Sequence, residues 1–156
     1  MIRDATEDDV PALMELVHAL AEYEREPDAV KMTAPMLRAA LFGPQPVAGC
    51  SVAELDGQVV GFALWYVTFS TWQGVPGIWL EDLFIRPQAR GHGLGAALLK
   101  ELARLCVARG YSRFEWWVLD WNTDAQGFYR RLGAEPEADW TVWRVAGPQL
   151  RALADS

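Results

Sequence analysis

The chain has 156 residues, of which 51% are hydrophobic and 12% are aromatic, enough to bury the core of one domain but not of two. Its formal net charge of −7 argues against a nucleic acid as partner and suits a cationic substrate. The charged opening MIRDATEDDV and the short apolar runs predict neither a signal peptide nor a membrane span, so we expect one cytoplasmic domain over residues 1–156.

The first half of the chain predicts two helices followed by a hairpin. The segment TEDDVPALMELVHALAEYE begins with Thr6 and Asp9 in capping-box spacing and continues with an apolar stripe, which predicts a helix of about five turns. A shorter helix is predicted for TAPMLRAALFG, ending at Gly43. The β-rich runs CSVAEL and QVVGFALWYVTF flank an Asp-Gly pair, which is a strong signal for a hairpin.

The second half of the chain alternates predicted strands with helices. After a loop at STWQGVPG, the segment IWLEDLFIRP predicts a strand that is apolar on both faces. A helix over Leu94–Ala108, a strand at SRFEWWVLD, a helix at NTDAQGFYRRLG and a last strand at WTVWRV follow. This order predicts an α/β fold with a mixed, mostly antiparallel central sheet flanked by helices.

The segment RGHGLGAALLK places three glycines at alternate positions directly before a predicted helix. Glycines at a helix start leave backbone N–H groups free to bind one anion, and the arginine adds a cation, so the segment predicts a phosphate site. A Walker loop is excluded because no Gly-Lys-Ser/Thr follows. The dinucleotide fingerprint G-x-G-x-x-G/A does match, but three predicted strands precede it and too little chain follows for a doubly wound sheet.

These segments resemble the GNAT superfamily of N-acetyltransferases, whose signature Arg/Gln-x-x-Gly-x-Gly/Ala matches Arg90, Gly93 and Gly95. The likeness covers nearly the whole chain. Within the superfamily, WLEDLFI and WNTDAQGFYRRLGA resemble the diamine (spermidine/spermine) acetyltransferase branch, which includes enzymes acting on thialysine. The loop between Trp72 and Leu80 departs from that branch, since it looks one residue longer.

The resemblance implies acetyl-CoA as co-substrate, without a metal. It places the pyrophosphate on the glycine turn and the pantetheine arm along the strand that precedes it. Trp116 and Trp117 fit a core role as well as a cofactor contact. The residues implied to bind the cofactor are Leu83, Phe84, Ile85, Arg90, Gly91, His92, Gly93, Leu94, Gly95, Ala96, Asn122 and Ala125.

The resemblance also implies the catalytic groups. Tyr129 matches the tyrosine that the family uses as an acid beside the CoA sulfur, although a core aromatic would suit the same helix stripe. Glu81 is the candidate base; on a regular strand it shares a face with Trp79, Leu83 and Ile85, while Asp82 points to the other face. Residues matching the branch's amine site are Tyr23, Glu24, Glu81 and Asp82, of which the first two would also suit a solvated helix end.

The implied function is transfer of an acetyl group from acetyl-CoA to a primary amine of a small cationic, diamine- or polyamine-like molecule, directly in a ternary complex. Thialysine or another amino acid is an alternative substrate, and a non-catalytic acyl-CoA-binding module is an alternative class. Glu137 and Asp139 could add charge to the site or be surface acids. The branch is commonly homodimeric through its C-terminal segment, and WTVWRV is an apolar strand candidate there.

Overall fold

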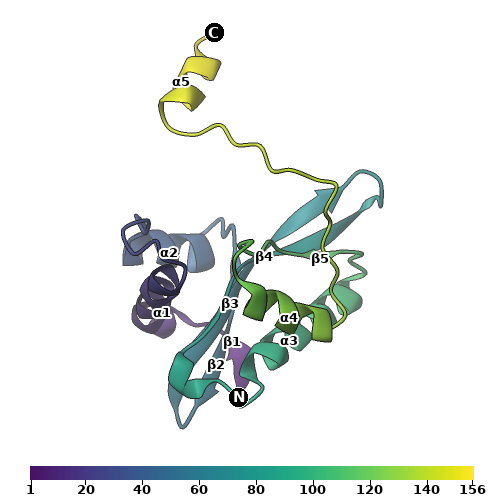
Figure 1. Ribbon diagram of the computed structural model, residues 1–156. Coiled ribbons are helices and arrows are strands. Elements are labelled where there is room, and N and C mark those ends of the chain that lie inside the picture. The colour runs from purple at the N-terminus through teal and green to yellow at the C-terminus, as the bar shows by residue number, and fades with distance from the viewer. The chain divides into compact units, whose positions relative to one another are not determined.

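A five-stranded sheet organises the first of two units in the computed structural model, which describes all residues 1–156 (Figure 1). The units are Met1–Trp117 and Val118–Ser156. In the first unit the strands follow chain order across the sheet, and only the last pair is parallel. This confirms the predicted α/β fold with a mostly antiparallel sheet. The strands are β1 (Ile2–Asp4), β2 (Gly49–Leu55), β3 (Gln58–Ser70), β4 (Val75–Ile85) and β5 (Phe114–Glu115).

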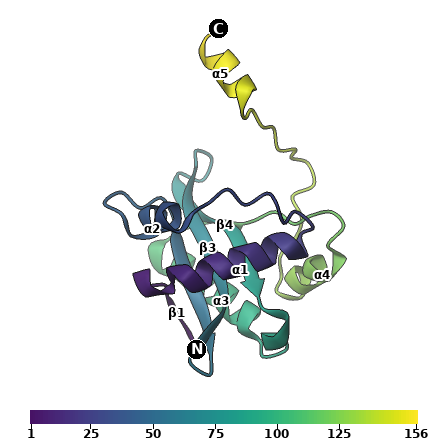
Figure 2. The same ribbon diagram turned by 90° about the vertical axis from the view of Figure 1, so that its left-hand side faces the viewer.

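Helices cover both faces of this sheet. Helices α1 (Val10–Tyr23) and α2 (Ala34–Phe42) lie on one face, and α3 (Leu94–Arg109) lies on the other (Figures 1 and 2). The apolar stripe of α1 packs with side chains of α2 and the central strands, as its 3.6-residue period predicts. The core on this face is formed by Val10, Leu13, Leu16, Leu20, Leu37, Leu41, Cys50, Val52, Phe62 and Phe84. No helix is both long and apolar enough to cross a bilayer.

Asp9 closes the capping box of the 3-10 turn η1 (Glu7–Asp9), which leads directly into α1, and ties this turn to the sheet. Its carboxylate accepts the backbone N–H of Thr6 at 2.7 Å and two guanidinium N–H groups of Arg3 at 2.7 and 2.9 Å. These hydrogen bonds, above all those from Arg3, lower the pKa of Asp9 to about 2. Ionised Asp9 therefore stabilises the fold at pH values above the ordinary carboxyl pKa, and this stabilisation is lost as the pH falls towards 2.

The hairpin between β2 and β3 forms where Asp-Gly predicts it. Asp56 and Gly57 both have positive φ, 51° and 76°, the conformation that a two-residue turn between twisted antiparallel strands requires. Helices α1, α2 and α3 also occupy their predicted segments, and α3 ends at Gly110 in the left-handed conformation, as its sequence indicates.

The predicted loop at STWQGVPG is shorter in the structure, because β4 begins at Val75 and pairs with Ser70 of β3. Pro76 and Gly77, typical of loops, lie within the strand. The carbonyl of Pro76 accepts the N–H of Ser112 at 3.3 Å, and a Cβ on Gly77 would lie 2.8 Å from the carbonyl oxygen of Arg113. Glycine is therefore needed there so that the chain leading into β5 can approach.

The predicted strand SRFEWWVLD is reduced to the two residues of β5, which pair with Ile78 and Trp79. Beyond Trp79, β4 continues to Ile85 with no strand on that side. Strands β4 and β5 therefore separate after two paired residues. From there to Ile85, the edge of β4 that faces away from β3 pairs with no strand.

The second unit contains α4 (Thr123–Arg131) and α5 (Pro148–Ala154). Helix α4 was predicted, and its start is capped by Asn122, whose Oδ1 accepts the N–H of Ala125 at 3.2 Å. The prediction of a strand at WTVWRV is wrong, because this segment pairs with no strand of the sheet. An apolar segment becomes a strand only where another backbone lies beside it to form the hydrogen-bonded ladder. Helix α5 was not predicted, although Pro148 at its first position is a start signal.

Candidate active site

The glycine turn has the backbone geometry that an anion site requires. Gly91 and Gly93 have φ of 85° and 72°, so both positions favour glycine. Gly93 is the N-cap of α3 and has no side chain that could cap the helix. The first hydrogen bond of the helix runs from the N–H of Ala97 to the carbonyl of Gly93. A Cβ on either glycine would meet nothing within 4 Å, so the space beside the turn is open. The N–H groups at the start of α3 are thus available to a ligand.

Arg90 supplies a positive charge next to this turn. Its Nε donates to the carbonyl oxygen of Ile85 at 3.1 Å, and its guanidinium lies over the rings of Tyr23 and Phe84, 5.2 and 5.8 Å from their centroids. No carboxylate lies within ion-pair distance of Arg90. The charge is therefore held in place without being neutralised, as an anion site needs.

The open edge of β4 presents the backbone groups of Leu83 and Ile85. The N–H of Arg86 donates to Val60 on β3, and successive residues of a strand alternate in the direction of their backbone groups. Those of Phe84 therefore face β3, and those of Leu83 and Ile85 face the open edge, where the Ile85 carbonyl meets Arg90. Unpaired amides there can bind an extended polar chain.

A β-bulge at Glu81 changes the predicted arrangement of the acidic residues. Leu64 pairs with Asp82, but the next residue of β3, Trp65, pairs with Leu80, so Glu81 is the extra residue. The predicted alternation across Trp79, Glu81, Leu83 and Ile85 is therefore wrong. Trp79, paired with Tyr66, lies on the same face as Asp82, and Leu83 points to the opposite face. Asp82 shares its face with the core residue Phe84, towards α1.

Three residues predicted to bind the substrate, Glu24, Glu81 and Asp82, form one acidic group at the bulge. Burial, followed by the charges of Glu81 and Glu24, raises the pKa of the half-buried Asp82 to about 7. Burial raises the pKa of Glu24 at the end of α1, and burial together with Glu81 raises that of the Tyr66 hydroxyl. Asp82 has no hydrogen-bond or cationic partner within the chain, so the group can accept a proton or a cation near neutral pH.

Neither cysteine is suited to act as a nucleophile, and the side chains that could bind a metal ion do not cluster. Cys50 is buried, which raises the pKa of its thiol to about 12, and burial also raises the pKa of Cys106. Neither is therefore poised as a thiolate nucleophile. No group of three His, Cys, Asp or Glu side chains is placed to hold a metal ion. His92 contacts the carbonyl of Ala89 through Nδ1 at 3.2 Å, which fixes the ring within the glycine turn.

Comparison with known proteins decides the family. Residues 12–134 match the acetyltransferase (GNAT) family. The chain is 40% identical to the thialysine N-epsilon-acetyltransferase of Bos taurus, over 99% of this chain and 96% of that protein. The chain belongs to the GNAT family of acetyltransferases. It is an acetyl-CoA-dependent N-acetyltransferase.

Two further similarities agree with this assignment. The chain is 31% identical to the human spermidine/spermine N(1)-acetyltransferase-like protein 1, over 98% of this chain and 23% of that longer protein. An integron cassette protein from the mobile metagenome of V. cholerae has the same fold, with a TM-score of 0.84 and 25% identity over 100% of this chain and 98% of its own.

The second unit of the acetyltransferase carries the remaining predicted site residues. Tyr129 lies on α4, with its ring tilted 55° against that of Phe128 at 5.3 Å between centroids. Asn122 and Ala125 are joined by the N-cap hydrogen bond, which gives both a structural role. The parts of these residues in catalysis and cofactor binding therefore stay predictions.

The two tryptophans after β5 in the acetyltransferase each contact another aromatic ring. The Trp117 ring meets that of Trp79 edge-on at 5.3 Å, and the Trp116 ring meets that of Phe114 at 5.0 Å. Trp116 is partly buried and Trp117 is 49% exposed, so the choice between a core role and a cofactor contact stays open.

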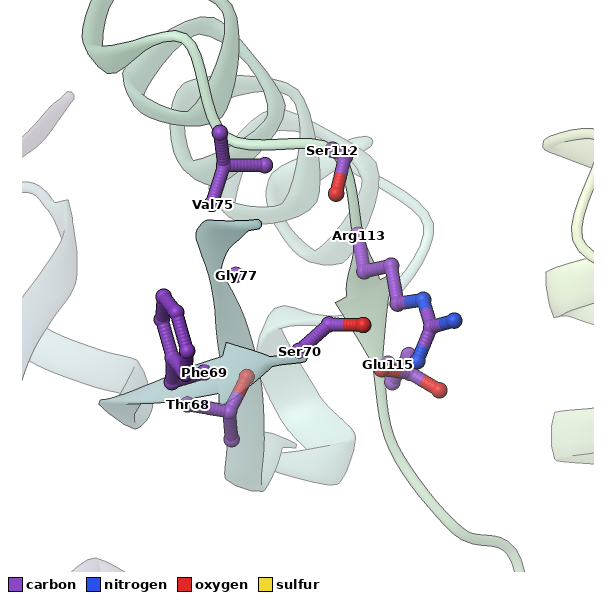
Figure 3. A pocket seen from close by; sticks show the side chains of 8 residues that line it. All are labelled: Thr68, Phe69, Ser70, Val75, Gly77, Ser112, Arg113 and Glu115. Carbon is purple, nitrogen blue, oxygen red and sulfur yellow. The ribbon is translucent and has the colours of Figure 1, made fainter. Parts of the chain in front are cut away.

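A small polar cavity of about 70 Å³ lies at the far end of β4 from the glycine turn (Figure 3). It is lined by the end of the β3–β4 hairpin and the chain around β5. The glycine turn follows the last residue of β4, whereas this cavity lies beside its first residues, so the cavity is separate from the glycine turn. Its lining residues are Thr68, Phe69, Ser70, Val75, Gly77, Ser112, Arg113 and Glu115.

Proposed function

We propose that this acetyltransferase acetylates the terminal primary amine of a small, extended cationic molecule, with thialysine or a diamine as substrate. The observation that carries the proposal is the stretch of β4 from Glu81 to Ile85. One end of this stretch holds the acidic group at the bulge, and the other end has free edge amides and leads to the glycine turn. An amine and an acyl-CoA can therefore meet on one strand.

Acetyl-CoA fits the open edge and the turn. Its pyrophosphate would lie on the first-turn amides of α3 beside Arg90, and the amides of its pantetheine arm would pair with Leu83 and Ile85. The N–H of Leu83, on the open edge next to the acidic group, is our candidate donor to the acetyl oxygen as negative charge develops there. The fit rests on the open space beside Gly91 and Gly93, which larger side chains would fill.

The acidic group would bind the amine and take its proton. An alkyl ammonium has a pKa of about 10.4 and must be deprotonated before it can attack a thioester. The charge of Glu81 raises the pKa of the half-buried Asp82, so Asp82 can receive that proton near neutral pH. Glu24 would add a further charge to hold a second cationic end of the substrate.

Protonation of the leaving thiolate would fall to Tyr129. We assign Tyr129 this role within a single catalytic domain over residues 1–156, because the family match across residues 12–134 includes its helix α4. Direct transfer in a ternary complex is supported by the raised pKa of both thiols, which leaves no ready nucleophile to carry the acetyl group.

Thialysine is placed first because the bovine relative that carries its name covers nearly the whole chain. A diamine remains the second substrate, since the human spermidine/spermine-type relative also spans nearly all of this chain. Both molecules carry a primary ammonium at the end of a flexible chain, which the unpaired Asp82 carboxyl suits.

The pH dependence of the Glu81→Gln variant tests this proposal. In the wild type, kcat/KM for the amine should rise as the pH passes through about 7, where Asp82 ionises. Removing the Glu81 charge should lower the pKa of Asp82, so the acidic limb should move to lower pH while the maximal rate falls at least about tenfold. Initial rates of thiol release between about pH 5.5 and pH 9, a range that includes both sides of that limb, measure both effects.

The matched control is Glu137→Gln, which removes the same charge from an exposed position in the second unit. This variant should keep the wild-type rate and pH profile. An unmoved acidic limb in Glu81→Gln, or equal losses in the two variants, would contradict the role of the bulge carboxylates.

We also propose that two copies assemble through the C-terminal segment. Val142, Trp143 and Val145 are exposed on a stretch that pairs with no strand of the sheet, and an exposed apolar segment of this kind favours contact with a second chain. Light scattering at micromolar concentration should give twice the chain mass, and replacing Trp143 by Glu should give the monomer mass. A wild-type monomer would refute this assembly.

A further inference from the structure

Two aromatic rings hold the guanidinium of Arg90, as two others hold that of Arg109. Several other arginines are paired with carboxylates; the Nη of Arg86, for example, lies 2.9 Å from Glu15. Arg90 instead lies over Tyr23 at 5.2 Å and Phe84 at 5.8 Å, while its Nε donates to Ile85. Rings orient a guanidinium without cancelling its charge, so an incoming anion meets the full cation in a fixed position.

These contacts join two parts of the first unit that are far apart in sequence. Tyr23 is the last residue of α1, whereas Arg90 belongs to the turn after β4. The residue after Tyr23 is Glu24, whose charge acts on Asp82. The end of α1 therefore contacts Arg90 through Tyr23 and acts electrostatically on Asp82 through Glu24.

We infer that Tyr23 is a positioning residue for the diphosphate end of acetyl-CoA, acting through Arg90, and that it couples the binding of the two substrates. The inference rests on the proposed function of the glycine turn. Tyr23, predicted from the sequence as a wall of the amine site, thereby also contributes to cofactor affinity. An amine that fixes the end of α1 also fixes the ring under Arg90, and by linkage acetyl-CoA strengthens amine binding to the same degree.

A double-mutant cycle tests the inference. Tyr23→Leu removes the ring, Tyr23→Phe keeps it, and Arg90→Met removes the cation. Calorimetry with CoA should show about fivefold weaker binding for Tyr23→Leu and near wild-type binding for Tyr23→Phe. In the Arg90→Met background, adding Tyr23→Leu should change CoA affinity less than about twofold, because the ring then has no guanidinium to hold.

S-acetylpantetheine, which lacks the diphosphate, separates positioning from general damage to the fold. Measured by calorimetry without amine, its Kd should be the same for the wild type and Tyr23→Leu. The wild-type enzyme should also bind CoA about fivefold more tightly in the presence of a saturating amine, and Tyr23→Leu should lose this gain. Tyr23 is 38% exposed, so its truncation should leave the melting temperature nearly unchanged.

Two results would overturn the inference while leaving the proposed function intact: an equal loss for CoA and S-acetylpantetheine, or a Tyr23→Leu effect that persists in full without Arg90. Wild-type protein that fails to bind CoA at all would overturn the proposed function and this inference together.

Discussion

Replacing Gly93 by valine should abolish measurable acetyl-CoA binding. The Cβ of residue 93 projects into the open space beside the turn, and the branched side chain would occupy the volume proposed for the pyrophosphate. Valine also disfavours the φ of 72° found there, so the first-turn amides of α3 would lose their alignment. Calorimetric titration with CoA measures the effect, which should exceed about 100-fold in Kd if several charge-assisted hydrogen bonds are lost.

The other end of the same helix provides a matched control. Gly110, the C-cap of α3, has a φ of 69° and equally open space at its Cβ. Gly110→Val should therefore suffer comparable backbone strain, on the order of 1–2 kcal/mol of stability, and keep its affinity for CoA. Equal binding losses in the two variants would show that strain, and not a phosphate site, explains the result at Gly93.

Tyr129→Phe should lower kcat by about 100-fold or more, with little change in the Kd for acetyl-CoA. The hydroxyl is proposed to protonate the thiolate only as it leaves, and general acids contribute on this scale. Tyr111→Phe removes the same hydroxyl from a ring that packs under Arg109 at the end of α3, and it should leave kcat unchanged. Steady-state rates of thiol release measure both variants.

The same experiment addresses direct transfer. With its pKa raised to about 12, the thiol of Cys50 should carry no acetyl group during turnover, and intact-protein mass spectrometry should find none on Cys106 either. Full activity in Tyr129→Phe would remove this residue from the mechanism. An acetyl-cysteine that forms and decays at the rate of turnover would replace direct transfer with a two-step route.

The features that could be predicted from sequence are those set by local backbone constraints. Asp56-Gly57 requires a turn with positive φ at both residues, and Gly91 and Gly93 mark a left-handed backbone at the start of a helix. The capping box of the 3-10 turn Glu7–Asp9, which leads directly into α1, follows likewise from the three-residue spacing of Thr6 and Asp9. In each case the residues that determine the structure are neighbours in the chain, so one short segment carries the whole signal.

The features that could not be predicted depend on contacts between distant segments. Glu81 becomes the extra residue of a bulge only through the register of β4 on β3, and no residue type marks that position. The raised pKa of Asp82 follows from burial and from Glu24 at the end of α1. Gly77 looked like part of a loop because its close neighbour, the Arg113 carbonyl, lies in a later segment.

Product analysis of the wild-type enzyme tests the central claim most directly. The protein is incubated with acetyl-CoA and, separately, with thialysine, a short diamine, spermidine and an uncharged aromatic amine, and each mixture is analysed by mass spectrometry. The account predicts that thialysine or a diamine gains one acetyl group on a primary amine, with one CoA thiol released for each product molecule and no reaction of the aromatic amine. Efficient acetylation of the aromatic amine, with none of the three cationic amines modified, would contradict it.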